Sequence, residues 1–273
     1  MKFRGRVVVV TGASSGIGEQ ACLDFAKRGA DVVLVARSKS RMEALADKMR
    51  QNYHTHTLVV PCDVSWKAQV LSLSKKVFDE FDHVDILVNN AGFAIFGSVN
   101  ELSIEEIEEQ ISTNLLGSIY CTKVFLPSML SRKEGHIVNV ASVAGSIGIP
   151  GIAAYCASKF GMLGFSQSLY HELKGTGVGV TVVSPITVKT NFFNHRSFNK
   201  IKPNYSPIGL SASQVSKAIL RASNSKRLEI IVPFYVRGAV WLMHTLPYVT
   251  NPIVGAAFRR QMREVEAADL TQY

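Results

Sequence analysis

Cysteine pairs and metal-ligand clusters are missing from this sequence. The four cysteines are widely spaced, at Cys22, Cys62, Cys121 and Cys156. None forms a CxxC pair or a cluster with histidine, so we expect buried free thiols and no metal site. The chain also lacks the interleaved basic and aromatic residues of nucleic-acid-binding proteins, so no nucleic acid is expected as a partner.

A secretory signal, internal repeats and linkers are also missing. The charged start, residues 1–6, leads straight into four valines, a run too short for the apolar region of a signal peptide. We therefore expect the chain to begin at Met1 and to be cytoplasmic. A chain of 273 residues with 47% hydrophobic content can bury one large core. The sequence thus predicts a single domain.

Negative charge is scarcer than positive charge. The chain has 30 lysine and arginine residues against 21 aspartate and glutamate residues, a formal net charge of +9. This excess suits solubility alone, but it also suits a phosphate-bearing cofactor, an acyl-CoA or carrier-protein substrate, or an anionic membrane surface. The charge by itself does not choose among these partners.

Short β-branched runs alternate with amphipathic stretches of helical length as far as about residue 232. The alternation is typical of βαβ units, and several runs are continuously apolar, as in strands covered on both faces. It predicts an α/β fold with a parallel sheet. Strands are expected at residues 7–10, 31–35, 57–60, 84–88, 136–140, 179–183 and 228–232. Helices are expected at residues 16–28, 40–51, 66–81, 103–131, 155–174 and 211–223.

A glycine-rich turn follows the first expected strand and opens the first expected helix. Its sequence, TGASSGIG at residues 11–18, has glycine where backbone must approach a pyrophosphate, and the helix N-terminus offers amide donors to that anion. The spacing departs by one residue from the GxGxxG fingerprint, and a purely structural tight turn is the alternative. The candidate cofactor-binding residues here are Gly12, Ser14, Ser15, Gly16, Ile17 and Gly18.

The end of the second expected strand indicates which dinucleotide is bound. A carboxylate about 20 residues beyond the glycine turn would bind the adenosine ribose hydroxyls of NAD. This chain has Ala36 and Arg37 there, and the planar guanidinium of Arg37 can pair with a 2′-phosphate. Lys39 or Arg41 could share or replace that contact, and a solvated surface arginine is the alternative. NADP(H) is therefore the expected cofactor.

A tyrosine and a lysine stand four residues apart in an expected helix. This spacing places the phenol of Tyr155 and the ammonium of Lys159 on one helical face. A tyrosine with an ordinary pKa of about 10 is a poor base at neutral pH, and a nearby cation would favour its phenolate. Ser142, at the end of the fifth expected strand, adds a hydroxyl at the edge of the sheet where ligands collect. Each signal is weak alone, because the Tyr-x-x-x-Lys spacing occurs by chance in many helices.

The order and spacing of these motifs resemble those of the short-chain dehydrogenases/reductases. The resemblance rests on TGASSGIG, on the NNAG sequence at residues 89–92, on Ser142 and on the pair Tyr155 and Lys159, and it covers about residues 5–232. It implies a single doubly wound Rossmann-type domain with a seven-stranded parallel sheet. It also implies an enzyme that moves a hydride between nicotinamide and a carbonyl or secondary alcohol. Residues 1–232 would then form the NADP(H)-binding catalytic domain.

The resemblance implies a role for each position of the site. Tyr155 would be the general acid or base, and Lys159 would lower its pKa and hold the nicotinamide ribose. Ser142 would steady the substrate oxygen, and Asn114 would anchor a water relay to the lysine. Three further cofactor contacts are implied at Asp63, next to the adenine, Asn90, beside the fourth strand, and Thr190, at the carboxamide.

Structural roles stay open for two of these residues. Asp63 could instead cap the helix that follows it. Asn114 lies inside a long apolar helix, where a buried amide needs partners, so it could kink or bridge the structure without catalysis. The chain departs from the family at Ile186, because the family usually has a glycine after the proline there. The resemblance therefore leaves the local backbone near the nicotinamide undetermined.

A long connection at residues 185–210 resembles the family's mobile substrate lid. Its aromatic residues could cover an apolar substrate or pack on the domain body. They are Phe192, Phe193, Phe198 and Tyr205, of which Phe192 and Phe193 are the candidate substrate contacts. We expect a hydrophobic ketone or aldehyde, and a 3-oxoacyl thioester of acyl carrier protein or CoA is the alternative. A catalytically silent dinucleotide-binding regulator is the alternative of another class, against which the complete catalytic set argues.

The C-terminal extension, residues 233–273, is apolar and aromatic at first and charged afterwards. Pro247 and Pro252 interrupt the apolar stretch, so no membrane-spanning helix is expected. Residues 234–263 combine apolar, aromatic and basic side chains, which suits peripheral contact with an anionic membrane, and packing on the pocket or on another subunit is the alternative. By analogy with the family, the long helices at 103–131 and 155–174 predict a homodimer or homotetramer.

Overall fold

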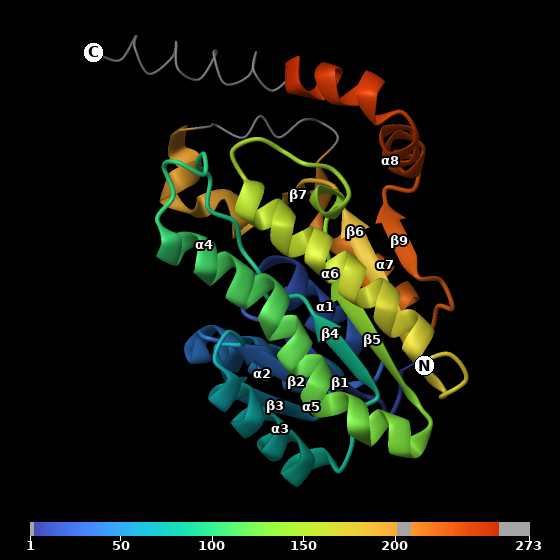
Figure 1. The fold of residues 1–273 in the computed structure, drawn as a ribbon. Helices are drawn as coiled ribbons and strands as arrows, with labels where there is room; N and C mark the ends of the chain where they lie inside the picture. The colour runs from blue at the N-terminus through green and yellow to red at the C-terminus, as the bar shows by residue number, and fades with distance from the viewer. Residues whose placement is uncertain (1–2, 201–208, 257–273) are drawn as a thin grey trace.

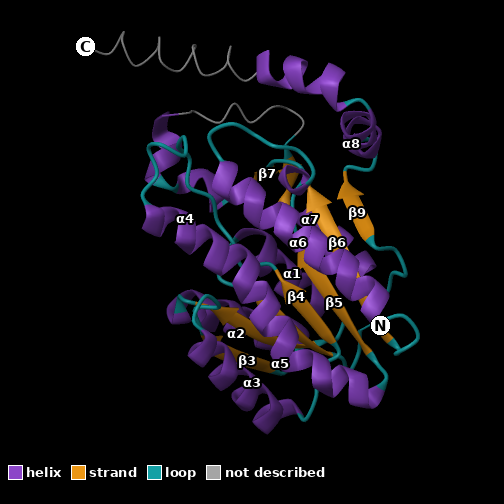
Figure 2. Ribbon diagram, viewed as in Figure 1, coloured by secondary structure: helices purple, strands orange, loops and turns teal. Residues whose placement is uncertain are grey.

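A parallel sheet of seven strands forms the middle layer of the protein (Figure 1). The computed structural model describes residues 3–200 and 209–256. Helices cover both faces of the sheet (Figure 2), so the doubly wound α/β fold is confirmed. The strand order is β3-β2-β1-β4-β5-β6-β9, in which the winding reverses between β1 and β4. The strands are β1 (Val7–Thr11), β2 (Asp31–Ala36), β3 (Thr57–Pro61), β4 (Ile86–Asn89), β5 (Gly135–Val140), β6 (Val178–Pro185) and β9 (Glu229–Val232).

The helices lie where the sequence predicted them, with ends that differ by a few residues. The expected helix at 103–131 consists of α4, a π-helical segment η1 and α5, which follow one another directly. A capping box of Ser103 and Glu106 begins α4. The helices of the domain are α1 (Gly16–Ala26), α2 (Lys39–Tyr53), α3 (Lys67–Phe81), α4 (Ile104–Ile111), η1 (Ser112–Leu116), α5 (Gly117–Arg132), α6 (Ala153–Glu172) and α7 (Ala212–Ala222).

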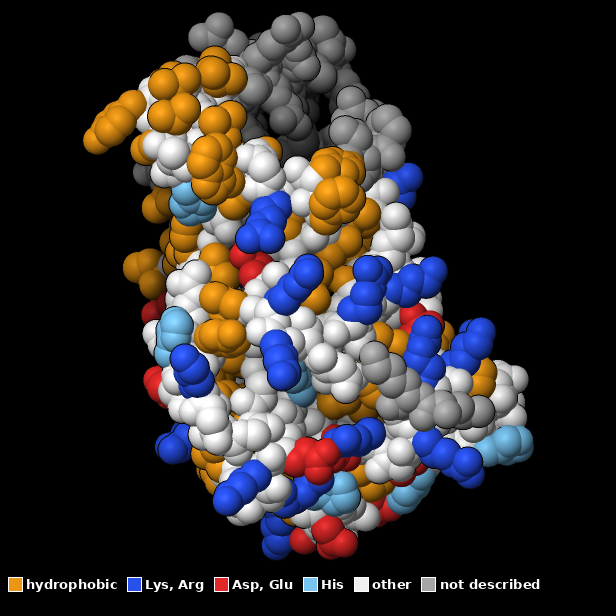
Figure 3. Space-filling view, turned by 90° about the vertical axis from the view of Figure 1, so that its right-hand side faces the viewer, with side chains coloured by type: hydrophobic (Ala, Val, Ile, Leu, Met, Phe, Trp, Pro, Cys, Tyr) orange, Lys and Arg blue, Asp and Glu red, His pale blue; other side chains and the backbone are white. Residues whose placement is uncertain are grey.

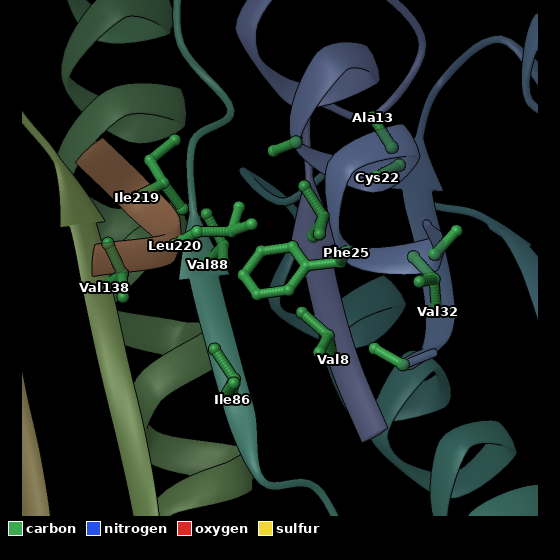
Figure 4. Close-up of a cluster of buried hydrophobic side chains, with 14 of the residues drawn as sticks. Val8, Ala13, Cys22, Phe25, Val32, Ile86, Val88, Val138, Ile219 and Leu220 are labelled. Carbon is green, nitrogen blue, oxygen red and sulfur yellow. The ribbon is translucent and has the colours of Figure 1, made fainter. Parts of the chain in front are cut away.

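Two hydrophobic layers hold the helices to the sheet. Side chains of β1 alternate, so Val8 and Val10 face the layer under α1, α2 and α7, while Val7 and Val9 face α3, α5 and α6. Phe25 of α1 is fully buried in the first layer (Figure 4). Burial of such a side chain contributes about 1.5–3 kcal/mol. The two layers therefore hold the carboxyl ends of the central strands in fixed positions, where a site can be built.

The connection after β6 contains short elements that the sequence did not predict. Strand β7 (Val188–Lys189) pairs with β8 (Leu210–Ser211) in a separate two-stranded sheet. Between them lie two 3-10 turns, η3 (Asn191–Asn194) and η4 (Arg196–Lys200). Two-residue strands and single turns have too little periodicity to be recognised in a sequence. Tyr205 lies outside the described residues.

Beyond β9 the chain forms helix α8 (Val236–Thr245), and residues 247–256 are also helical. The two helices meet at Leu246, and Pro247 stands in the first turn of the second helix, where proline is tolerated, whereas Pro252 lies within that helix. Among the described residues, no helix is long and apolar enough to cross a membrane. Residues 257–273, with the expected basic flank, lie outside the described part of the chain.

Candidate active site

The glycine turn lies at the carboxyl end of β1 and has no room for side chains. Gly12 and Gly16 have φ angles of +68° and +59°, which favour glycine. A Cβ on Gly12 would lie 2.8 Å from the amide nitrogen of Asn90, and a Cβ on Gly18 would overlap the carbonyl oxygen of Gly12. The glycines therefore allow α1 to start directly against the strand ends.

The N-terminus of α1 is suited to an anion. Ser15 is its N-cap, with extended backbone and no side-chain capping hydrogen bond, so the first amides are not satisfied by a cap. Such an N-terminus attracts phosphate through its amides and its dipole. A Cβ on Gly16 would lie 3.2 Å from the side chain of Thr190, which places Thr190 directly against the turn. The half-buried residues at this N-terminus are Ser14, Ser15, Gly16 and Ile17, and they fit the pyrophosphate of a dinucleotide.

Asn90 joins the ends of β1 and β4. Its side-chain amide donates to the carbonyl oxygen of Thr11 at 3.0 Å. The hydroxyl of Thr11 in turn accepts from the backbone amides of Asn90 at 2.9 Å and Ala91 at 3.0 Å. Sequence reasoning did not assign Thr11 to the site, although it opens the glycine motif. These bonds hold the loop after β4 beside the glycine turn.

Arg37 stands at the end of β2 with its side chain 70% exposed. Its guanidinium lies 3.9 Å from a carboxylate oxygen of Asp63 and 3.8 Å from one of Glu109. Asp63 also accepts from the backbone amide of Ser65 at 3.0 Å and from its hydroxyl at 2.7 Å. The alternative that Asp63 caps the next helix is wrong, because Trp66 is the N-cap of α3. An exposed arginine at this edge can reach a 2′-phosphate.

Ser142, Tyr155 and Lys159 meet beyond the carboxyl end of β5. The Ser142 hydroxyl interacts with the Tyr155 phenol, accepts from the amide of Ala144 at 3.1 Å and donates to the carbonyl oxygen of Pro185 at 3.4 Å. The ammonium of Lys159 donates to the carbonyl oxygen of Val140 at 2.9 Å and lies 5.6 Å from the centre of the Tyr155 ring. Tyr155 is 8% exposed and Lys159 is 4% exposed. The structure thus brings three of the four predicted catalytic side chains into one cluster, in which Tyr155 and Lys159 are buried and Ser142 is half-buried.

Burial governs the pKa values in this cluster. It raises the pKa of Tyr155, and the hydrogen bond with Ser142 offsets part of that rise. It lowers the pKa of Lys159 to about 8. Desolvation of the covered phenol is the largest influence on the Tyr155 pKa, and the expected lowering of that pKa by the Lys159 ammonium stays a prediction. A phenol held neutral is suited to donate a proton.

Asn114, in the π-helical segment η1, bridges the loop after β4 and helix α6. Its carbonyl oxygen accepts from the backbone amide of Phe93 at 2.9 Å, and its amide donates to the carbonyl oxygen of Phe93 at 2.9 Å and to the hydroxyl of Ser158 at 3.1 Å. The side chain is fully buried. Asn114 therefore bridges parts of the structure from a π-helical turn, and its role in a water relay to the lysine stays a prediction.

Aromatic rings from the lid cover Tyr155. The ring of Phe192 meets Tyr155 edge to face at 5.5 Å, and Phe193 packs on Phe192 at 5.1 Å. Phe198 lies 5.2 Å from Phe193 and 6.0 Å from Phe96, which comes from the loop after β4. Phe192 and Phe193 therefore lie at the site, and their contact with the substrate stays a prediction. Phe96 was missed, because nothing in its local sequence links it to a lid 100 residues away.

A hydrogen bond fastens the lid to the loop after β4. The hydroxyl of Ser197 accepts from the backbone amide of Phe96 at 2.9 Å. The same hydroxyl lies 2.8 Å from Nδ1 of His195, so its proton can point to the imidazole. We call Ser197 with its bond to Phe96 the lid latch. No sequence signal marks a single serine in an irregular segment.

Ile186 continues the sheet instead of turning sharply. Its backbone amide donates to the carbonyl oxygen of Val232 at 3.0 Å, which extends the pairing of β6 with β9 by one residue. Its side chain is half buried against the first hydrophobic layer. The isoleucine is thus accommodated as an apolar contact, and its φ is not in the left-handed region.

Comparisons with known proteins agree with this geometry. A family model described as "short chain dehydrogenase" matches residues 6–200. Human 17-beta-hydroxysteroid dehydrogenase 13 is 34% identical over 254 residues, which cover 92% of this chain and 82% of that protein. A Burkholderia phymatum enzyme of the family in complex with NAD has a TM-score of 0.82 at 28% identity, covering 92% and 96% of the two chains. A short-chain dehydrogenase from Sphingobium yanoikuyae in complex with NADPH has a TM-score of 0.79 at 31% identity, covering 92% and 95%.

The chain belongs to the short-chain dehydrogenase/reductase family. It is accordingly an oxidoreductase that acts on CH–OH or C=O groups. The family resemblance expected from TGASSGIG, Ser142, Tyr155 and Lys159 is confirmed. Structural neighbours include complexes with NAD and with NADPH, so the nicotinamide cofactor is common to them while its phosphorylation differs.

Proposed function

We propose that this enzyme uses NADP(H) to interconvert a hydrophobic ketone or aldehyde and the corresponding alcohol. The single observation that carries the proposal is the aromatic cover over Tyr155. The phenol lies against Phe192 and is 8% exposed, so a carbonyl oxygen that reaches it must come from a group able to displace or lie between rings. A strongly hydrated sugar would have to lose its water there, whereas an apolar carbonyl compound gains from burial.

The residues of the cluster divide the work of a reduction. NADPH, when bound at the glycine turn, would supply the hydride. The Tyr155 hydroxyl donates its proton to the substrate oxygen, since burial keeps the phenol neutral. Ser142, which already bonds the phenol, holds that oxygen in place. The ammonium of Lys159 lies close enough to favour the phenolate that remains, and general acid catalysis of this kind contributes about 10²–10⁴-fold.

The preference for the phosphorylated coenzyme rests on the end of β2. Ala36 offers no carboxylate to the ribose, and Arg37 presents an exposed guanidinium beside it. The ion-pair distances from Arg37 to Asp63 and Glu109, 3.9 and 3.8 Å, are long, so a phosphate can compete for the guanidinium. The NADPH complex of the Sphingobium relative supports this preference, whereas the Burkholderia relative is in complex with NAD.

Relatives named as a 17-beta-hydroxysteroid dehydrogenase and as an estradiol 17-beta-dehydrogenase support a bulky apolar substrate. The test is a screen of NADPH oxidation by the purified enzyme over apolar ketones and aldehydes, sugars and 3-oxoacyl thioesters, with Tyr155→Phe as the inactive control. We expect turnover of the apolar carbonyl compounds. Faster turnover of a thioester would replace the substrate class, and NADPH binding without any turnover would identify a silent regulator.

We further propose a cytoplasmic homodimer or homotetramer that associates through the long helices. Phe160 of α6 and Leu130 of α5 are exposed apolar side chains on these helices, 42% and 37% accessible. Four buried free cysteines suit a reducing compartment. Light scattering on the purified protein measures the mass, and Phe160→Glu should lower it. A monomeric mass for the unmodified protein would refute the association, and recovery from a secretory fraction would refute the location.

A further inference from the structure

Apolar side chains gather on the outer surface of the C-terminal arm, which we define as residues 234–256. Most of the exposed large hydrophobic side chains of the described chain lie in this one segment: Phe234, Tyr235, Trp241, Leu242, Leu246, Tyr248, Val249 and Ile253. Tyr248 is 94% exposed and Phe234 is 83% exposed. Figure 3 shows such side chains together at the upper end of the molecule. Contiguous apolar surface of this kind marks an interaction site.

The arm presents this surface through helical spacing. Leu242 and the C-cap Leu246 stand four residues apart and are exposed together with Trp241, while Val240 of α8 is buried against the body. In the helix at 247–256, Thr250 is the buried residue. Each helix thus rests a narrow side on the domain and turns its broader apolar side outward. The pattern is the reverse of a helix that completes a core, and it excludes the alternative that these outward residues finish the substrate pocket.

The charge of the arm selects the partner. No acidic residue occurs from Ile230 to Arg263, Arg237 on the arm is exposed, and the whole chain carries a net charge of +9. Exposed tryptophan and tyrosine next to basic residues are typical of proteins that lie in the interface of an anionic bilayer. A second copy of the arm would instead oppose like charges around the apolar surface. We propose that the arm docks this enzyme in the plane of an anionic phospholipid bilayer.

Docking by the arm would orient the substrate site. The arm begins after Val232 of β9, which pairs with Pro185 of β6, and the lid begins after Pro185. Lid and arm therefore leave the sheet from adjacent strand ends, at the same end of the molecule (Figure 1). A bilayer under the arm faces the lid, so an apolar carbonyl compound dissolved in lipid can enter without crossing water. This last step rests on the proposed function, whereas the docking itself does not.

The chain contains only two tryptophans, and both are 65% exposed. Trp241 is on the arm and Trp66 is the N-cap of α3, so each serves as the control for the other. Full-length Trp66→Phe and Trp241→Phe variants are mixed with phosphatidylcholine vesicles containing either no phosphatidylserine or an added fraction of it. In Trp66→Phe the remaining tryptophan is Trp241. We expect its emission to shift to the blue and to be quenched by brominated lipid, but only with vesicles that contain phosphatidylserine. Trp241→Phe should show neither change.

Vesicle flotation measures the affinity independently of any substrate. A Trp241→Ser/Ile253→Ser variant should bind serine-containing vesicles at least about tenfold more weakly, whereas Trp66→Ser should bind like the unmodified protein. Turnover of a water-soluble carbonyl compound should be the same in all three, so loss of activity tests the proposed function separately. Equal flotation of both variants would overturn the docking. The docking would also be overturned if the emission of Trp241 shifted with protein concentration alone while the molecular mass in solution doubled. The arm would then be a subunit interface.

Discussion

The two sides of the active site are built by opposite means. On the coenzyme side, Gly12 and Gly18 form the wall by having no side chain, and the backbone of the turn touches Asn90 and its own carbonyl groups. On the substrate side, the wall consists of rings, with Phe192 and Phe198 packed over the reacting phenol. Contacts that only glycine permits are rigid and specific, whereas rings can be exchanged with modest cost. The coenzyme side should therefore tolerate little change and the substrate side considerably more.

Tyr155 lies where the two sides meet, so it should be the most sensitive position. Tyr155→Phe keeps the ring that packs on Phe192 but removes the transferable proton. We expect turnover to fall about 10²–10⁴-fold or more, with NADPH affinity nearly unchanged. Steady-state kinetics and NADPH fluorescence titration measure the two quantities. Substantial remaining turnover would contradict the assignment of Tyr155 as the acid.

Gly18→Ala tests the rigidity of the coenzyme side. The new Cβ overlaps the carbonyl oxygen of Gly12, so α1 must shift away from the strand. We expect a loss of about 1–3 kcal/mol in the free energy of unfolding, together with weaker NADPH binding. Gly164→Ala is the matched control, because Gly164 is also helical but nothing lies within 4 Å of an added Cβ. That variant should gain about 0.5–1 kcal/mol, and equal effects at both glycines would refute the comparison.

The preference for NADPH over NADH should depend on only two side chains at the end of β2. A double substitution, Ala36→Asp with Arg37→Gln, adds the carboxylate that NADH prefers and removes the exposed guanidinium. A charge-assisted hydrogen bond is worth about 1.5–3 kcal/mol, so the NADPH/NADH preference should fall roughly 10- to 150-fold. The ratio of kcat/KM for the two coenzymes measures it. A preference for NADH in the unmodified enzyme would show that Arg37 serves only its ion pairs.

The same contrast explains how much the sequence could predict. The turn at residues 11–18 and the pair Tyr155 and Lys159 were recognised because sterics and helical spacing leave few residue types for those positions. The strands were recognised because most of them are runs of buried apolar residues, although β9 is only half-buried. The lid latch could not be recognised, because Ser197 and Phe96 are paired by the tertiary fold and neither lies in a periodic segment. The direction of the pKa shift of Tyr155 could not be predicted either, because it depends on how completely other residues cover the phenol.

The buried ammonium of Lys159 predicts a pH dependence. Burial lowers its pKa to about 8, so the folded enzyme loses this charge as the pH rises through about 8. If the charge supports the Tyr155 phenolate, kcat/KM should fall toward tenfold per pH unit above that pH. Lys159→Arg, whose guanidinium stays charged, should move the fall to higher pH in whatever activity it retains. A flat profile between pH 8 and 10 would refute the role of the charge.

The free energy of unfolding should change with pH in the opposite direction to kcat/KM. The unfolded chain keeps the Lys159 proton up to about pH 10.5 and the folded chain only to about 8, so the unfolded state binds more protons between these values. The contribution of this residue to stability therefore rises with pH across that window. Lys159→Met removes the buried charge and should raise the free energy of unfolding at pH 7 by about 1–3 kcal/mol while activity is lost. Denaturant unfolding measures the change, and destabilisation would show that the bond to Val140 dominates.

The smallest expected effect is at the lid latch, on the side of the site that tolerates change. Ser197→Ala removes the acceptor for the Phe96 amide and leaves the surrounding rings in place. One hydrogen bond contributes about 0.5–1.5 kcal/mol, so the closed lid should be favoured roughly 2- to 12-fold less. Because closure positions an apolar substrate, KM for that substrate should rise by a similar factor, while kcat with a small carbonyl compound that needs little cover should hardly change. Ser131→Ala, at an exposed serine on α5 far from the lid, is the control and should leave both constants unchanged. If Ser197→Ala alters the NADPH affinity as strongly as the substrate KM, the lid contributes to both sides of the site. The separation of a coenzyme side from a substrate side would then be wrong.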